Sequence, residues 1–252
     1  MEQQLNIVKK DYKFPRVSLI APNHSFYLLI AAEIDRSPFP FFLTTSDRKK
    51  SLIENARRWC QLLKNEEAVV SADVFKATLI PPGKGKLLKE RFGKARLPKY
   101  DFVILIELYT AEKLNETLAT DDYRRIEAYI RENSTSVHII TATNIKRIGD
   151  VNHEKPGVFL FNYFYADDVT QNIAVWEYTA GWFQQETALD NSTVLLPCDS
   201  KSSRYKIINH CRWNSMWNIL PSLIFKKSFH TYVLDNFYAN KVAAMPILYK
   251  LA

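Results

Sequence analysis

The C-terminal part of the chain has the clearest pattern of apolar and polar positions. Residues 158–165 are an unbroken apolar and aromatic run, which predicts a strand covered on both faces. Asp167 and Asp168 can then cap a helix whose apolar residues recur every three or four positions. The predicted elements are a strand at 158–165, a helix at 169–186, strands at 192–196 and 205–213, a helix at 216–236 and a strand at 245–250. This β-α-β-β-α-β order is the ferredoxin-like split motif. In this chain, Pro221 lies in the first turn of the second predicted helix or kinks that helix.

The N-terminal part repeats this order of elements. Its first helix carries an apolar stripe at Leu52, Ala56, Trp59 and Leu63. The predicted elements are a helix at 46–65, strands at 69–80 and 100–109, a helix at 111–132 and a strand at 137–143. The first strand of this unit is one of three extended segments, at 17–20, 26–34 or 39–44.

Short motifs also mark the repeat. Asn55 and Trp59 precede a Leu-Ile-Pro run at 79–81, and Asn172 and Trp176 precede a Leu-Leu-Pro run at 195–197 at nearly the same distance. Tyr-Arg-Arg at 123–125 corresponds to Phe-Lys-Lys at 225–227. Gly, Asn, His, Lys and Pro interrupt the strand patterns at 149–157. We therefore expect two halves, residues 1–150 and 151–252.

A strand that is apolar on both faces needs a layer on each side. The helices of a β-α-β-β-α-β unit cover one face of its sheet, so the other face has to pack on a second sheet. The other half can supply that sheet within the same chain. The sequence therefore predicts an α+β protein: two ferredoxin-like repeats fused in tandem, with their sheets packed face to face as a pseudo-dimeric α+β barrel. Further oligomerisation stays open.

Most of the net charge lies in one segment. Seven basic residues and one acidic residue fall between Gly83 and Lys99, which accounts for six of the seven net positive charges. Proteins that bind nucleic acid spread basic groups over a face and interleave aromatic residues, whereas this segment contains only Phe92. We expect residues 83–99 to be an exposed insertion between two strands, with contact to a polyanion as the alternative.

Composition narrows the class of protein further. The 252 residues are 47% hydrophobic and 13% aromatic, enough for buried cores. The apolar runs fall short of the roughly 20 residues that a membrane-spanning helix needs, so a cytoplasmic protein without membrane association is expected. The three cysteines have no metal-site spacing, and neither a hydrolase triad nor a metal motif can be assembled.

The second half resembles a known superfamily. Phe-Leu-Phe-Asn at 159–162, Trp-Glu-Tyr-Thr-Ala-Gly-Trp-Phe at 176–183 and Trp-Asn-Ser at 213–215 are similar to the dimeric α+β barrel proteins, especially the antibiotic-biosynthesis-monooxygenase-like branch. The resemblance covers about 100 residues of the second half, and the first half shows a weaker similarity. It implies a barrel shared by two sheets and a small-molecule pocket between each sheet and its helices. Members include cofactor-free monooxygenases of polyaromatic substrates and haem-degrading enzymes, so the resemblance implies fold better than function.

This half is also similar to the haem-degrading branch, whose members have an Asn on the first strand and a Trp followed by an axial His. Asn162 matches the first, and Trp217 and His230 are candidates for the others. One extra residue before His230 would turn its side chain by roughly 100° around a helix, which places haem ligation in doubt. No cofactor is therefore expected, with haem as the alternative.

Three residues are the candidate catalytic groups. Asn162 is a carboxamide inside an aromatic strand, suited to orienting a substrate oxygen, or else a core amide bonded to backbone. Trp213 ends a strand and would line the pocket. His210 would handle a proton or an anion, and it shares a strand face with Arg212.

Further candidates are aromatic and cationic side chains near the same elements, each with core packing or solvent exposure as the alternative. The candidate ligand-binding residues are Trp176, Tyr178, Trp182, Arg212, Trp217 and His230.

The leading hypothesis is therefore the binding of an aromatic or apolar small molecule in the second half. Oxidation of that molecule by oxygen without a cofactor is its extension, because such a reaction needs only desolvation, orientation and hydrogen bonds from the protein. A non-catalytic binding or interaction module and a haem-binding protein are the two alternatives. Nucleic acid is not an expected partner.

Overall fold

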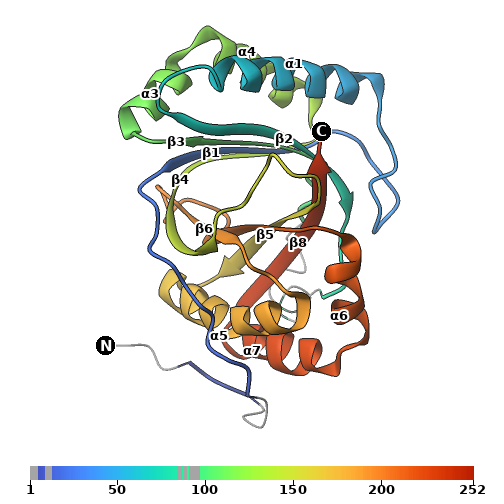
Figure 1. The fold of residues 1–252 in the computed structure, drawn as a ribbon. Coiled ribbons are helices and arrows are strands. Elements are labelled where there is room, and N and C mark those ends of the chain that lie inside the picture. Colours follow the sequence, from blue (N-terminus) through green and yellow to red (C-terminus); the bar gives the residue numbers. More distant parts are fainter. Residues whose placement is uncertain (1–4, 9–12, 84–86, 88–89, 91–96) are drawn as a thin grey trace.

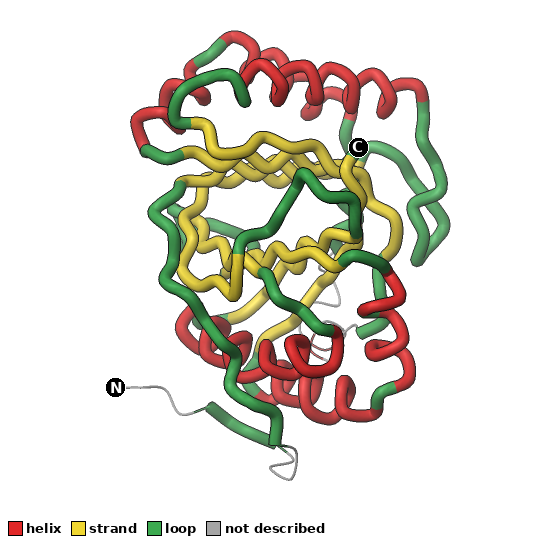
Figure 2. Tube along the Cα trace, viewed as in Figure 1, coloured by secondary structure: helices red, strands yellow, loops and turns green. Residues whose placement is uncertain are grey.

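The computed structural model describes residues 5–8, 13–83, 87, 90 and 97–252. Within these residues, eight strands form a closed barrel in the order β1-β3-β2-β8-β5-β7-β6-β4, and every pairing is antiparallel. The barrel lies between two layers of helices (Figures 1 and 2). The first half comprises β1 (Phe26–Glu33), α1 (Asp47–Leu63), β2 (Val69–Leu79), β3 (Phe102–Leu108), α3 (Ala111–Ala119), α4 (Asp121–Asn133) and β4 (Ser136–Gly149). The second comprises β5 (Val158–Ala166), α5 (Val169–Thr187), β6 (Ser192–Pro197), β7 (Ile207–Trp213), η1 (Met216–Asn218), α6 (Leu220–Phe225), η2 (Phe229–Leu234), α7 (Asp235–Ala239) and β8 (Val242–Leu251).

The two halves share one sheet topology, which confirms the predicted tandem fusion. The first half has the strand order β4-β1-β3-β2, and the second has β8-β5-β7-β6. The sheets face each other across the barrel and also join at both edges, through β4 with β6 and β2 with β8. The barrel is thus completed within one chain, which leaves no sheet edge unpaired among these eight strands.

Strand alternation divides the apolar side chains into three clusters. One lies between the first sheet and α1, α3 and α4, and another lies between the second sheet and its helices. The third fills the barrel with aromatic rings from both halves, including Phe75, Phe161, Tyr163 and Tyr249. On β5, Phe159, Phe161 and Tyr163 point into the barrel, whereas Leu160 and Phe164 point toward the helices.

Several element boundaries differ from the sequence prediction. The first strand is β1, the second of the three proposed segments. The helix predicted at 111–132 is divided at Thr120, whose hydroxyl caps α4. The helix predicted at 216–236 consists of η1, α6, η2 and α7, with extended backbone at Lys226. β4 continues past Thr143 because its later residues pair with β6.

Most of the basic segment at 83–99 lies outside the described residues. Of the part that is described, Leu87 is buried against the cluster inside the barrel, and Glu90 accepts a hydrogen bond from the Tyr238 hydroxyl at 2.8 Å. The segment is therefore not entirely solvated, because Leu87 packs on the core. None of the described helices has the length and apolar character needed to span a bilayer.

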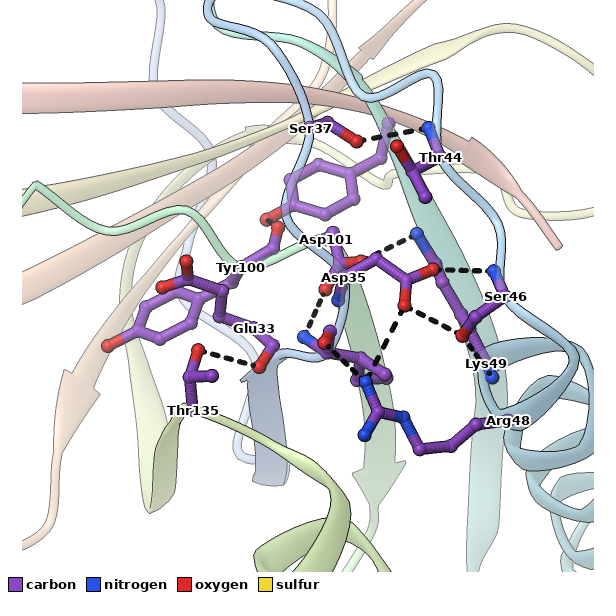
Figure 3. Close-up of polar contacts among 12 residues, drawn as sticks. Glu33, Asp35, Ser37, Thr44, Ser46, Arg48, Lys49, Tyr100, Asp101 and Thr135 are labelled. Atoms are coloured by element: carbon purple, nitrogen blue, oxygen red, sulfur yellow. Dashed lines mark hydrogen bonds and ion pairs between the residues drawn. The ribbon is translucent and has the colours of Figure 1, made fainter.

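A buried ion pair anchors the first half at one end of the barrel (Figure 3). Lys49 Nζ lies 2.7 Å from Asp101 Oδ2, and the two side chains are 3% and 1% exposed. Asp101 also accepts the backbone N–H groups of Ile34 and Asp35, and Asp35 accepts the N–H and hydroxyl of Ser46, the N-cap of α1. The network therefore ties the end of β1, the start of α1 and the start of β3 together.

Replacing Lys49 by Met should lower the free energy of unfolding by about 3–5 kcal/mol, because the Asp101 carboxylate would stay buried without its cation. Lys50→Met is the matched control, since the Lys50 side chain is 65% exposed and should change stability by less than about 0.5 kcal/mol. Urea unfolding of both variants measures the difference. Equal stability of the two variants would contradict this role for Lys49.

Residues 151–252 expressed alone should dimerise or aggregate. Without the first half, the interior face of β5 with Phe159, Phe161 and Tyr163 loses its cover, and β6 and β8 lose their edge partners. Light scattering on this fragment measures its mass. A folded, monomeric fragment would contradict the need for a second sheet.

Candidate functional site

Two small voids lie between the second sheet and its helices, where the resemblance places a pocket. Each has a volume of about 30 Å³, and they share Leu160, Asn162, Phe183 and Phe237 in their lining. Trp176 and Trp213 line the first void, which α5 covers. Phe229, from η2, lines the second. The space is therefore apolar, with Asn162 at the junction of the two voids.

Asn162 carries an unpaired carboxamide in this space. It lies on β5 opposite Asn209 of β7, on the face that points toward the helices. Its Oδ1 is enclosed without a hydrogen-bond partner, and no hydrogen bond of the carboxamide is found within the described part of the chain. An unsatisfied buried polar group costs about 1–3 kcal/mol, so a bound molecule that supplied a partner would gain from it.

Three of the four predicted tryptophans are buried, and two of these three donate hydrogen bonds. Trp213 is buried and donates its indole N–H to Thr187 Oγ1 at 3.0 Å. Trp182 is fully buried and donates to Ser228 Oγ at 2.9 Å, outside both voids. Trp176 is buried on the first void. Trp217, by contrast, is 83% exposed and lines neither void.

Polar groups that the sequence analysis missed also line the first void. Asn209 accepts a hydrogen bond from the Ser192 hydroxyl, and Cys211 lies two residues further along β7. Burial raises the pKa of the Cys211 thiol well above its usual value. Among the described residues, neither void is lined by a carboxylate or an imidazole. The space can thus desolvate and orient a molecule, but its walls offer no strong base.

The sheet separates His210 from Asn162 and Trp213. His210 and Trp213 stand three residues apart on β7, so their side chains point to opposite faces. His210 points into the barrel, where its ring stacks on Phe161 with centroids 4.2 Å apart. The three residues predicted to act together therefore occupy two compartments.

Inside the barrel, His210 belongs to a hydrogen-bonded chain of titratable groups. Asp73 Oδ2 lies 2.8 Å from His153 Nδ1, and His153 Nε2 lies 2.8 Å from His210 Nε2. His210 Nδ1 lies 3.0 Å from the carbonyl oxygen of Leu160. Lys64 Nζ contacts the other Asp73 oxygen at 2.6 Å. The chain joins β2, the linker between the halves, β7 and β5.

The chain requires one proton more than two neutral imidazoles carry. Both of its ends are acceptors, a carboxylate and a carbonyl, so its three hydrogen bonds need three N–H protons, whereas two neutral imidazoles have two. Burial, and then the charge of His153, lower the pKa of His210 well below its usual value. The three contacts therefore join a carboxylate, two imidazoles and a carbonyl in a chain that is one proton richer than two neutral rings.

The remaining predicted residues have other surroundings. Arg212 points to the same face as His210, as predicted, and donates to the carbonyls of Lys155 and Pro156 in the linker. The Tyr178 ring stacks on Tyr232 at 5.0 Å, and its carbonyl accepts from the Tyr232 hydroxyl. His230 is exposed and lines neither void.

Haem does not fit the residues of this site. No imidazole of the described residues lines the voids, so their walls offer no His ligand for a haem iron. No cluster of three or more His, Cys, Asp or Glu side chains within the described ranges could hold a metal ion. We therefore assign no step to haem or to a metal.

Comparison with known proteins finds similarity in structure but not in sequence. No family model and no curated protein matches the chain. An anthrone oxidase-like protein superposes with a TM-score of 0.64 and 12% identity, over 91% of this chain and 92% of the other. A protein from Fusobacterium nucleatum described as a candidate monooxygenase gives 0.54 and 8% over 91% and 92%, and one from Lactobacillus acidophilus gives 0.50 and 6% over 91% and 94%. The chain thus shares the α+β barrel fold of these proteins, with both repeats in one chain.

Asp73→Asn should destabilise the protein at neutral pH, because Lys64 and His153 would lose the carboxylate that both contact. Burial raises the pKa of Asp73, but His153 and Lys64 outweigh burial and hold that pKa below its usual value. A carboxyl with a lowered pKa stabilises the fold above its unfolded value of about 3.9, and this stabilisation is lost as the pH falls through the folded value. The stability difference from the wild type should therefore be full between pH 5 and 7 and shrink below about pH 4.

Urea unfolding across this pH range measures the difference, and Asp122→Asn, at an exposed position on α4, is the control. Histidine ¹⁵N spectra should in addition show three bound protons on the two rings in the wild type and fewer in the variant. Two bound protons in the wild type would contradict the extra charge.

Proposed function

We propose that the second half binds an aromatic, largely apolar small molecule between its sheet and its helices, and that oxygen oxidises this molecule without a resident cofactor. The observation that supports this proposal most directly is the unpaired Asn162 carboxamide at the junction of two apolar voids. The anthrone oxidase-like and candidate monooxygenase structures of the same fold support the reaction class.

The walls of the space suit an aromatic molecule that carries one oxygen. Trp176, Trp213 and Phe183 offer ring faces and edges, which aromatic ligands contact favourably. The carboxamide of Asn162 can donate to a ligand carbonyl or, after rotation of the amide about its last bond, accept from a hydroxyl. One ligand oxygen beside Asn162 therefore satisfies a group that the fold leaves without a partner.

The space has to enlarge to take such a molecule, and its cover on the α6 side is interrupted. The voids hold about one water molecule each, whereas an aromatic ring needs several times that volume. On the α6 side the cover consists of short segments, and η2 is a π-helix, an element found mostly at functional sites. The ligand enters by displacing α6 and η2 from the sheet.

The reaction needs no electron donor other than the substrate and no oxidant other than dioxygen. A methylene group activated by flanking aromatic rings reacts with one dioxygen to give a ketone and one water: two C–H bonds break, one oxygen atom joins the carbon and the other leaves as water. The substrate supplies all four electrons. Since no described carboxylate or imidazole lines the voids, the substrate gives its first proton to solvent before it is enclosed, which favours substrates that are already acidic. The protein excludes water and holds the developing oxyanion at Asn162.

Asn162→Leu should weaken the binding of 1-naphthol about three- to tenfold and leave naphthalene unchanged, because one hydrogen bond contributes about 0.5–1.5 kcal/mol. Calorimetric titration measures both ligands. Trp217→Ala, an exposed position outside the voids, is the control and should bind both ligands as the wild type does.

The reaction is tested with anthrone under ¹⁸O₂. The wild type should produce anthraquinone with one added ¹⁸O atom faster than buffer does, and Asn162→Leu should be slower. Ligand discrimination without acceleration would favour the non-catalytic binding module. No binding of either naphthalene compound would refute the proposed pocket.

A further inference from the structure

A larger and more polar cavity opens at one mouth of the barrel, on the other side of the second sheet from the voids. Its volume is about 680 Å³. Its walls come from β1, β2 and β3, from β4, β6 and β7, and from the linker between the halves. His153 and His210 of the proton-carrying chain line it. The cavity is large enough for a small metabolite.

The strand register arranges the wall residues in two rows. On the first sheet, Glu107 of β3 pairs with Tyr27 of β1 on one side and with Ser71 of β2 on the other, so the three residues lie side by side. On the opposite side, Arg147 pairs with Thr193 and Thr193 pairs with His210, across β4, β6 and β7. All six residues line the cavity.

The first row is rich in hydrogen-bond acceptors. The Glu107 carboxylate has no ion-pair partner among the described residues and accepts from Asn23 Nδ2 at 2.9 Å. Burial, and after it the charge of Glu107, raise the pKa of the Tyr27 hydroxyl well above its usual value. Ser71 Oγ and Asn23 Oδ1 are enclosed without partners. This wall therefore carries a carboxylate without a paired cation among the described residues, beside two polar atoms without partners.

The opposite wall is cationic. The guanidinium of Arg147 lies on the row formed by β4, β6 and β7, whereas Lys64 follows α1 and contacts Asp73 of β2 on the side of the first sheet. Lys64 Nζ uses one of its protons on Asp73, and Arg147 pairs through one nitrogen with the exposed Asp150. Both cations keep N–H groups that can bind a ligand oxygen. The cavity therefore has walls of opposite charge.

We infer that the barrel mouth is a second ligand site, which takes a small aminocarboxylate with its ammonium group at Glu107 and its carboxylate at Arg147. The ammonium supplies the positive charge that the Glu107 carboxylate lacks, and the carboxylate meets the Arg147 guanidinium that lines the cavity. A ligand with both charges compensates both walls, whereas a simple amine or acid compensates one. This site is independent of the Asn162 pocket.

The experiment titrates the full-length protein with aminocarboxylates from glycine to 6-aminohexanoate by calorimetry. The best binder is then compared with the amine and the carboxylic acid of the same chain length. The wild type should bind the aminocarboxylate at least about tenfold more tightly than either one-charge probe, since the second charged contact contributes about 1.5–3 kcal/mol.

Two variants distinguish the walls. Glu107→Gln should weaken the binding of the aminocarboxylate and of the amine, and leave the binding of the acid unchanged. Arg147→Gln should weaken the binding of the aminocarboxylate and of the acid, and leave the binding of the amine unchanged. Glu132→Gln, on an exposed position of α4 outside the cavity, should change none of them. Thermal melts of the same samples confirm that each variant is folded.

The inference fails if no aminocarboxylate binds at millimolar concentration, or if both cavity variants weaken all three probes equally. Unfolding of Glu107→Gln is addressed by Glu107→Asp, which keeps the charge and should retain the preference for aminocarboxylates over acids. A folded Glu107→Asp protein without that preference would also overturn the site.

Discussion

The pairing of β4 with β6 and of β2 with β8 is the constraint on which the rest of the structure depends. It closes two four-stranded sheets into one barrel, so each strand has one face inside the barrel and one face toward a helical layer. Neighbouring residues on a strand therefore enter different chemical environments. On β5, Phe161 packs among aromatic rings inside the barrel, while the adjacent Asn162 faces the voids under the helices. The division into an apolar pocket and a polar barrel mouth follows directly from this alternation.

The two halves use the same topology but cover their sheets differently. Trp59 on α1 and Trp176 on α5 occupy equivalent places in the repeat, and each is buried against its own sheet. The first sheet is covered by α1, α3 and α4, which are regular helices. On the second sheet, the place of α3 and α4 is taken by the shorter segments from η1 to α7. The second void lies beneath this interrupted cover, and the first lies beneath α5 with Phe237 of α7 at its edge, which explains why the candidate pocket belongs to the second half.

Sequence periodicity predicted the fold well because β-α-β-β-α-β order and the tandem repeat are local features. It predicted the face shared by His210 and Arg212, and the odd spacing between His210 and Trp213 already implied opposite faces. The partners of His210 could not be predicted. Asp73 and His153 are 80 residues apart in sequence and meet only because the linker crosses the barrel mouth beside β2. The exposure of Trp217 was missed because the broken helix around it has no apolar stripe to orient it.

The buried charges at the two barrel ends call for different explanations. Replacing a buried ion pair by well-packed apolar residues is often neutral or stabilising, so stability alone does not account for either group. Lys49 and Asp101 are sealed from solvent, and Asp101 also accepts two backbone N–H groups that would otherwise lack partners. That pair has a structural task. Among the residues that the structure describes, no backbone N–H donates to the side chain of Asp73 or His153, and His153 lines an open cavity. A charged chain that satisfies little of the fold and faces a cavity is best explained by a ligand that uses its charge.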